Sequence, residues 1–138
     1  MDRHRSSGYT LIEMMMAMAV FSIIAAMSVL GVSSFIRSSR LTGASNTLMT
    51  DLHYTRMMAS AKQSTYQIRF QPSSYTVVRV TPASTVLTRQ LPLGTTCAAT
   101  DTATFYPWGL SDSVTVTMTN SGHSSVLKVS ANGRVTHG

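Results

Sequence analysis

The sequence predicts an α+β protein in which one long N-terminal helix packs on a C-terminal antiparallel β-sheet domain. Residues 14–36 contain no charged side chain, and apolar residues keep a helical spacing up to about Lys62. From Ser64 onward, apolar and polar residues alternate. The first spacing is typical of helices and the second of strands. A chain of 138 residues has room for one ordinary core, which the helix and the sheet would share.

The first half of the helix is predicted to span a membrane. The uncharged run would be about 35 Å long as a helix, enough to cross the hydrocarbon of a bilayer. A buried core helix is the alternative, but the rest of the chain is too short to enclose it. The run also exceeds the apolar core of a secretory signal, so we expect it to be retained. Arg3 and Arg5 favour a cytoplasmic N-terminus, although Arg37 and Arg40 weaken that inference.

The second half of the helix, residues 37–62, is predicted to be amphipathic. Its apolar positions recur at steps of three, four and seven residues: Leu41, Ala44, Leu48, Leu52 and Ala59. Its polar residues lie elsewhere around the helix: Arg40, Asn46, Thr50, Arg56 and Lys62. No proline precedes Pro72, so we expect one helix from about Thr10 to Lys62, weakened at Gly31 and Gly43. The apolar stripe would cover the sheet.

Residues 63–138 are predicted to form a globular β domain. Strands are expected at 66–70, 75–81, 85–91, 114–119 and 127–131. Turns are expected at 71–74, 120–122 and Asn132-Gly133, the last being the strongest hairpin signal. Residues 92–109 are interpreted as a long loop with a short strand near 104–106. Within this loop, we expect Trp108 to fill the interior of the sheet domain and Cys97 to be a small packing residue.

Glu13 is a single carboxylate at the head of the apolar run. Such a group costs at least about 2.5 kcal/mol inside hydrocarbon unless it finds a partner or stays at the interface. A cut between Gly8 and Tyr9 would create an α-amino group about one helical turn away. Glu13 could neutralise that amino group in the same chain or in a neighbouring one.

Residues 8–13, GYTLIE, followed by an apolar helix, resemble the class III signal of type IV pilins and pseudopilins, whose usual form has Phe in place of Tyr9. The resemblance implies the pilin fold and a prepilin peptidase that cuts between Gly8 and Tyr9 and methylates Tyr9. It also implies that Glu13 pairs with a neighbouring subunit's amino group during assembly. Major pilins usually have a proline where this chain has Leu30, so the resemblance does not carry the helix melting of major pilins in a filament over to this chain.

The resemblance also implies a division of the chain. Residues 1–8 would be the leader peptide, 9–36 the transmembrane and assembly half of the helix, 37–62 the amphipathic half, and 63–138 the β domain. The protein would cross the inner membrane once, with a cytoplasmic N-terminus, before it enters a periplasmic or extracellular filament.

The remaining residues are similar to the GspH/FimT-like group of minor pilins and pseudopilins. The similarity rests on the strands at 66–70, 114–119 and 126–130 and on the closing Gly133-Arg134 turn. It implies a structural subunit that primes or caps a type IV pilus or a type II secretion pseudopilus. Its partners would be the peptidase, other minor pilins or pseudopilins, the major pilin and the inner-membrane assembly platform.

The alternative function is DNA binding for natural transformation. Some members of this group bind DNA through basic residues near the C-terminus, where this chain has Lys128 and Arg134. Phosphate contacts from Lys and Arg are the physical basis of such binding. His123 and His137 lie in the same region. A basic, solvated sheet edge explains the same residues without DNA.

The composition argues against an enzyme, a cofactor and a metal site. Charged residues make up only 12% of the chain, so few carboxylates are present for a hydrolytic pair. The single cysteine excludes an intramolecular disulfide and a Cys-rich zinc module. Residues 109–112 lack the closing glycine of a nucleophile elbow, and phosphate-loop and paired-His motifs are absent. The net charge of +6 is spread without a Lys/Arg run.

Overall fold

The computed structural model describes the backbone of residues 9–138 and the side chains of residues 9–27 and 32–138. Residues 1–8, which the sequence predicts to be a leader peptide and which include Gly8, lie outside the described residues. The chain divides into two compact units, the first ending at Phe35 and the second comprising Ile36–Gly138.

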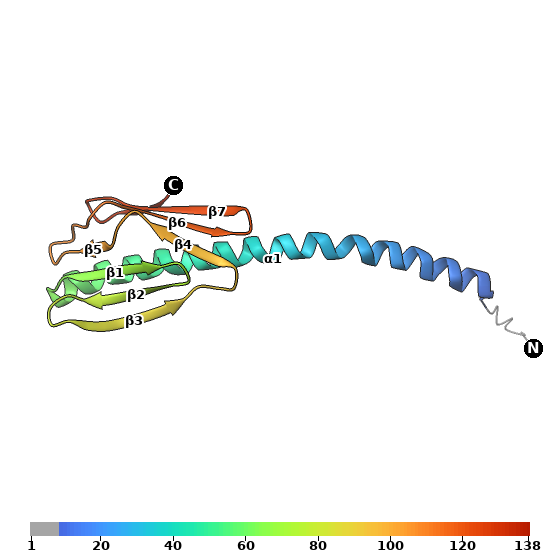
Figure 1. Cartoon of the computed structure of the whole chain (residues 1–138), viewed down its shortest axis with the longest axis horizontal. Coiled ribbons are helices and arrows are strands. Elements are labelled where there is room, and N and C mark those ends of the chain that lie inside the picture. The colour runs from blue at the N-terminus through green and yellow to red at the C-terminus, as the bar shows by residue number, and fades with distance from the viewer. Residues whose placement is uncertain (1–8) are drawn as a thin grey trace, which may run out of the picture. The chain divides into compact units, whose positions relative to one another are not determined.

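The helix α1 covers Leu11–Lys62, within one residue of the predicted limits (Figure 1). It continues through Gly31 and Gly43, so the expected weak points do not interrupt it. The helix ends where Gln63 adopts a left-handed backbone conformation, with φ 49°, and the Ser64 amide donates to the Ala59 carbonyl. This hydrogen bond satisfies a carbonyl of the last turn, as in many helix C-termini.

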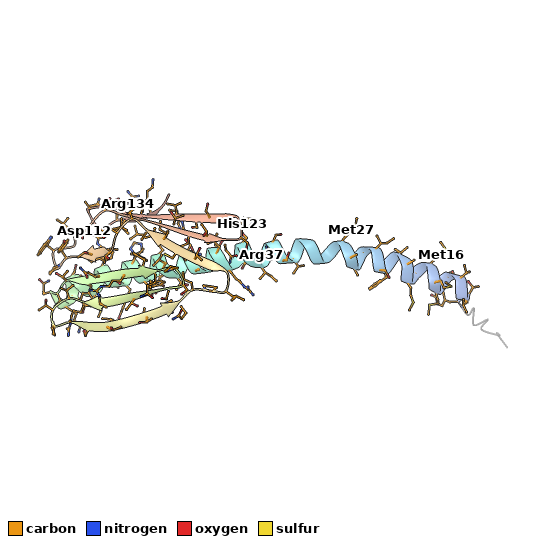
Figure 2. All side chains as sticks on the ribbon, viewed as in Figure 1. Met16, Met27, Arg37, Asp112, His123 and Arg134 are labelled. Atoms are coloured by element: carbon orange, nitrogen blue, oxygen red, sulfur yellow. The ribbon has the colours of Figure 1, made fainter. Side chains whose placement is uncertain are left out.

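In the first unit, every described side chain is exposed, and most are apolar. Met16 and Met27 lie along this part of α1 (Figure 2). Among the described residues, α1 is the one helix long and apolar enough to cross a membrane, judged by length and composition alone. A helix that is apolar on all sides is stable only inside a bilayer or against other apolar helices.

The second unit contains eight strands in two antiparallel four-stranded sheets (Figure 1). The strands of the first sheet are β3 (Ser84–Gln90), β2 (Ser74–Arg79), β1 (Tyr66–Gln71) and β5 (Ala103–Phe105), in that spatial order. Those of the second sheet are β4 (Thr95–Ala99), β6 (Val114–Asn120), β7 (His123–Val129) and β8 (Val135–His137). The Cys97 amide donates to the Pro72 carbonyl and so connects the two sheets.

The predicted helix stripe is confirmed. Leu41, Ala44, Leu48, Leu52 and Ala59 are all buried. They share one core with inward-facing residues of both sheets, including Ile68, Val77, Phe105, Val116, Met118 and Leu127. Burial of this stripe supplies the apolar contact that stabilises the helix against the sheets.

The predicted turns are also confirmed. Gln71 pairs with Ser74 across a two-residue loop, and Asn120 pairs with His123 across Ser121-Gly122. Ser121 and Gly122 both have positive φ angles, 46° and 89°, as a type I′ hairpin turn requires. The Asn132-Gly133 segment joins β7 to β8.

The predicted antiparallel β-sheet domain is confirmed, and its strands form two sheets. Two expectations about individual segments are wrong. The predicted loop at 92–109 contains β4 as well as β5, because Thr95–Ala99 pairs with the distant strand β6 and gains order from that pairing. The strand expected at 127–131 ends at Val129, and Ala131 lies exposed in the following turn.

Trp108 is also placed differently from the prediction. It is 68% exposed instead of filling the domain interior. Its ring stacks on Tyr106, with centroids 5.2 Å apart and an interplanar angle of 6°. Phe105, three residues earlier, is fully buried, and the Gly109 amide donates to the Tyr106 carbonyl across the turn that contains Trp108.

Candidate assembly site

The start of α1 places Glu13 beside the backbone that precedes the helix. The carboxylate Oε2 accepts hydrogen bonds from the Thr10 amide and the Thr10 hydroxyl, both at 3.3 Å. The Glu13 amide in turn donates to the Thr10 hydroxyl oxygen at 3.4 Å. This reciprocal arrangement is a capping box, which satisfies amides that the first helical turn leaves free. Glu13 therefore has a role within its own chain.

The same geometry bears on the predicted cut. Tyr9 directly precedes Thr10 and is 83% exposed. Because the Glu13 carboxylate contacts the Thr10 amide, it lies one residue from the position where a Tyr9 amino group would appear. The capping role of Thr10 was not predicted, although Thr-x-x-Glu before an apolar run is a recognisable capping signal. Gly8, the other residue of the predicted cleavage site, lies outside the described residues.

Lys128 and Arg134 lie on the solvent side of the second sheet. Val129 and Val135 pair with each other and are buried, so their neighbours Lys128 and Arg134 face outward. Both basic side chains are exposed. Lys128 pairs with Thr136, which places Lys128 diagonally across the hairpin from Arg134. The structure thus brings these two predicted residues onto one surface.

Of the two histidines named with them, His123 lies apart from this pair. His123 begins β7, and Figure 2 shows it toward the end of the second unit opposite Arg134. His137 ends β8 and is paired with Leu127. The basic surface therefore consists of Lys128 and Arg134 without a histidine cluster.

The turn that carries Arg134 is held by Arg56 of α1. The Arg56 Nε donates to the Gly109 carbonyl at 3.3 Å, and Nη2 donates to the Asn132 carbonyl at 3.1 Å. The Arg134 amide donates to the Asn132 side chain at 3.0 Å. Arg56 was expected to be a surface residue of the helix, but it connects two loops that are distant in sequence.

A cluster of Asp51, Tyr75 and Arg89, called the Asp51 cluster below, was not predicted. The Asp51 carboxylate accepts the Tyr75 hydroxyl at 2.6 Å and the Arg89 Nε at 2.8 Å. Burial, and then the hydrogen bond to Asp51, raise the pKa of Tyr75. The hydrogen bond to Asp51 also raises the pKa of Arg89. One signal was available: Asp51 lies on the apolar helix stripe, where a charge requires a partner.

Two further features limit the chemistry of the described residues. Burial raises the pKa of the Cys97 thiol to about 11, so the thiol is protonated and unreactive at neutral pH. No group of three His, Cys, Asp or Glu side chains in residues 9–138 is placed to hold a metal ion. The arrangement is suited to packing and to surface contacts.

Comparison with known protein families agrees with this geometry. The family model of the prokaryotic N-terminal methylation motif matches residues 3–29. The family model of type II transport protein GspH matches residues 44–133, which is more than half of the chain. The chain belongs to the GspH family. No curated protein gives a significant sequence match.

Solved structures show that this GspH-family chain has the fold of minor pilins and pseudopilins. The type IV minor pilin FimU of Pseudomonas aeruginosa aligns with a TM-score of 0.63 and 17% identity, over 75% of this chain and 92% of FimU. The minor pseudopilin EpsH of the Vibrio cholerae type 2 secretion system aligns with a TM-score of 0.64 and 10% identity, over 71% of this chain and 95% of EpsH. The predicted pilin fold is confirmed.

The methylation motif and the apolar helix indicate that this GspH-family protein is anchored in the inner membrane before it enters a pilus or pseudopilus. The family and the fold are those of structural pilin subunits, which are not enzymes.

Proposed function

We propose that this chain is a minor pilin or pseudopilin that is cut between Gly8 and Tyr9, methylated at Tyr9, and then primes or caps a filament. The observation that carries the proposal is the position of the Glu13 carboxylate, bonded to the Thr10 amide next to Tyr9. In the membrane, that carboxylate requires a positive partner. The amino group of a neighbouring processed subunit would supply it.

Each segment of the chain has a separate role in this proposal. Residues 9–36 hold the protein in the inner membrane, with the N-terminus in the cytoplasm where a prepilin peptidase acts. The exposed apolar side chains of this segment then pack against other pilin helices, which replace the lipid. Residues 37–62 carry the β domain of residues 63–138 into contact with other minor subunits, the major subunit and the assembly platform. The β domain would lie at the filament tip.

Gly8→Ala tests the processing step. We expect the variant to keep its leader, because the peptidase must approach the backbone closely at this residue. Mass spectrometry of the membrane fraction would distinguish the precursor from a mature chain that begins at methylated Tyr9. A Gly8→Ala chain that is still processed normally to Tyr9 would contradict the proposed leader.

Glu13 variants separate helix capping from charge pairing. Glu13→Gln keeps an oxygen that can accept the Thr10 bonds but removes the charge, whereas Glu13→Ala removes both. Charge pairing predicts that both variants insert into the membrane and that both enter filaments poorly. Immunoblots of sheared filaments against membrane fractions measure this. Normal incorporation of Glu13→Gln would show that Glu13 acts only as a cap.

The second candidate function is DNA binding by a minor pilin during natural transformation. The observation that favours it is the exposure of Lys128 and Arg134 on one surface of the β7–β8 hairpin. Each contact to a phosphate releases counterions, so binding would weaken as salt rises.

A gel shift with the full chain in nonionic detergent tests this function. We expect the double variant Lys128→Ala, Arg134→Ala to lose affinity for DNA. The slope of log affinity against log salt concentration should also become shallower, by the amount expected for about two phosphate contacts. Lys62→Ala, which removes an exposed charge at the end of α1, is the control. Failure of the unmodified chain to bind at low salt would refute DNA binding.

A further inference from the structure

A groove of about 340 Å³ lies in the second unit between α1 and the β2–β3 side of the first sheet. Arg40, Gly43 and Thr47 line it from the helix, and Tyr75, Arg89 and Leu91 line it from the sheet side. We call it the arginine groove. None of its lining residues is acidic.

The Asp51 cluster holds one arginine at the wall of this groove. Arg89 donates two hydrogen bonds to the Asp51 carboxylate, from Nε at 2.8 Å and from Nη2 at 3.3 Å. A guanidinium group carries five N–H donors, so this pairing leaves others available. The Arg89 side chain is 43% exposed, whereas that of Asp51 is only 9% exposed. The buried Asp51 carboxylate therefore holds the Arg89 guanidinium in place, and the rest of the guanidinium stays exposed to solvent.

The second arginine has no such partner. Arg40 is exposed, and no hydrogen bond or ion pair to its side chain occurs within residues 9–27 and 32–138. The helix side of the groove has free space, because a Cβ atom added at Gly43 would meet no heavy atom within 4 Å. Two guanidinium groups thus line the groove, and the Asp51 carboxylate neutralises one of them.

We propose that the arginine groove receives one acidic side chain, Asp or Glu, from a neighbouring subunit of the filament. This proposal rests on the proposed function, since it requires assembly. Charge complementarity supports it, because one carboxylate would balance the unmatched guanidinium. Guanidinium groups bind carboxylates in a fixed, often bidentate geometry, so the contact would also set the orientation of the two subunits.

A peptide titration tests the groove without requiring assembly. The full chain in dodecyl maltoside, labelled with ¹⁵N at arginine, is titrated with acetyl-Gly-Glu-Gly-amide while the Arg Nε–H resonances are followed. We expect the Arg40 and Arg89 resonances to shift saturably, and the matching Gln peptide to have no effect. Arg40→Gln should weaken binding about fivefold, the factor for an ion pair worth about 1 kcal/mol, and Arg37→Gln should leave it unchanged.

A second pair of variants tests whether peptide binding requires the free space in the arginine groove. Gly43→Leu adds a side chain at the wall of the groove, where a Cβ atom meets no heavy atom within 4 Å, and should abolish the peptide shifts. Asn46→Leu, an exposed position outside the groove, should not. Shifts that are equal at all exposed arginines would refute the proposal. Equal shifts with inorganic phosphate would also refute it, because they would indicate a general anion site or a lipid headgroup site.

Filament incorporation tests the source of the carboxylate. We expect Arg40→Glu to enter filaments several-fold less than Arg37→Glu, while both reach the membrane equally. Equal incorporation of the two variants would overturn the neighbouring subunit as the source. If the unmodified chain itself is absent from filaments, the proposed function fails, whereas the peptide titration still decides whether the groove binds a carboxylate.

Discussion

Replacement of Arg89 by methionine should destabilise the β domain more than replacement of its partner Asp51 by asparagine. The reason is the difference in exposure across the ion pair, in which the Arg89 side chain is 43% exposed and that of Asp51 is 9% exposed. After Asp51→Asn, the arginine can turn into water, and the amide oxygen of the new asparagine can still accept the Tyr75 hydroxyl. After Arg89→Met, the carboxylate stays buried without its cation.

The expected magnitudes follow from this asymmetry. An uncompensated buried charge costs about 3–5 kcal/mol, and the remaining 2.6 Å bond from Tyr75 reduces this to about 2–4 kcal/mol for Arg89→Met. Asp51→Asn should cost about 1 kcal/mol, the upper end of the range for an ion pair whose cation can return to water. The double variant buries no charge, so it should be more stable than Arg89→Met alone.

Urea denaturation of the full chain in nonionic detergent, followed by circular dichroism of the sheets, gives the free energies of unfolding. The three variants and the unmodified chain form a double-mutant cycle. The explanation fails if the two single substitutions cost the same, or if the double variant loses the sum of both.

Three further predictions use the same assay. Leu52→Ala removes a side chain with no exposed surface and should lower the free energy of unfolding by about 2–5 kcal/mol. The control Met57→Ala, at a residue that is 64% exposed, should change it by less than about 0.5 kcal/mol. Equal effects of the two substitutions would contradict the assigned core. Gly133→Ala would put a Cβ 2.6 Å from both the Arg56 Nε and the Gly109 carbonyl and should cost at least about 2 kcal/mol. Gly122 has a similarly positive φ but open space around it, so Gly122→Ala should cost about 1 kcal/mol. If the two glycine variants lose the same free energy of unfolding, the contacts of Arg56 do not contribute to stability. Burial raises the pKa of Cys97 from 9.0 to about 11, so the unfolded chain loses this proton first as pH rises. The free energy of unfolding should therefore fall by about 2 kcal/mol between pH 9 and 11. Cys97→Ala should remove that part of the decline, and an unchanged pH profile would argue against the burial of the thiol.

The sequence by itself determined the features that depend on neighbouring residues. The uncharged run at 14–36, the stripe that includes Leu48 and Leu52, and the Asn132-Gly133 turn each follow from spacing or backbone preference within a short segment. The junction at Gly8–Glu13 was recognisable for the same reason, since a carboxylate at the head of an apolar helix is conspicuous without a fold. These patterns sufficed for the fold class and the family.

Only the tertiary structure decided which distant residues meet. The pairing of Asp51 with Arg89 depends on where β3 lies against the helix, which neither segment specifies by itself. Strand β4 is defined by its pairing with β6, and only the fold shows that Phe105 is buried while Trp108 is exposed. Periodicity reports which side of its own element a residue faces, but it carries no information about the partner across the core. The arginine groove therefore exists only in the fold, because its lining residues come from segments whose approach no local pattern specifies.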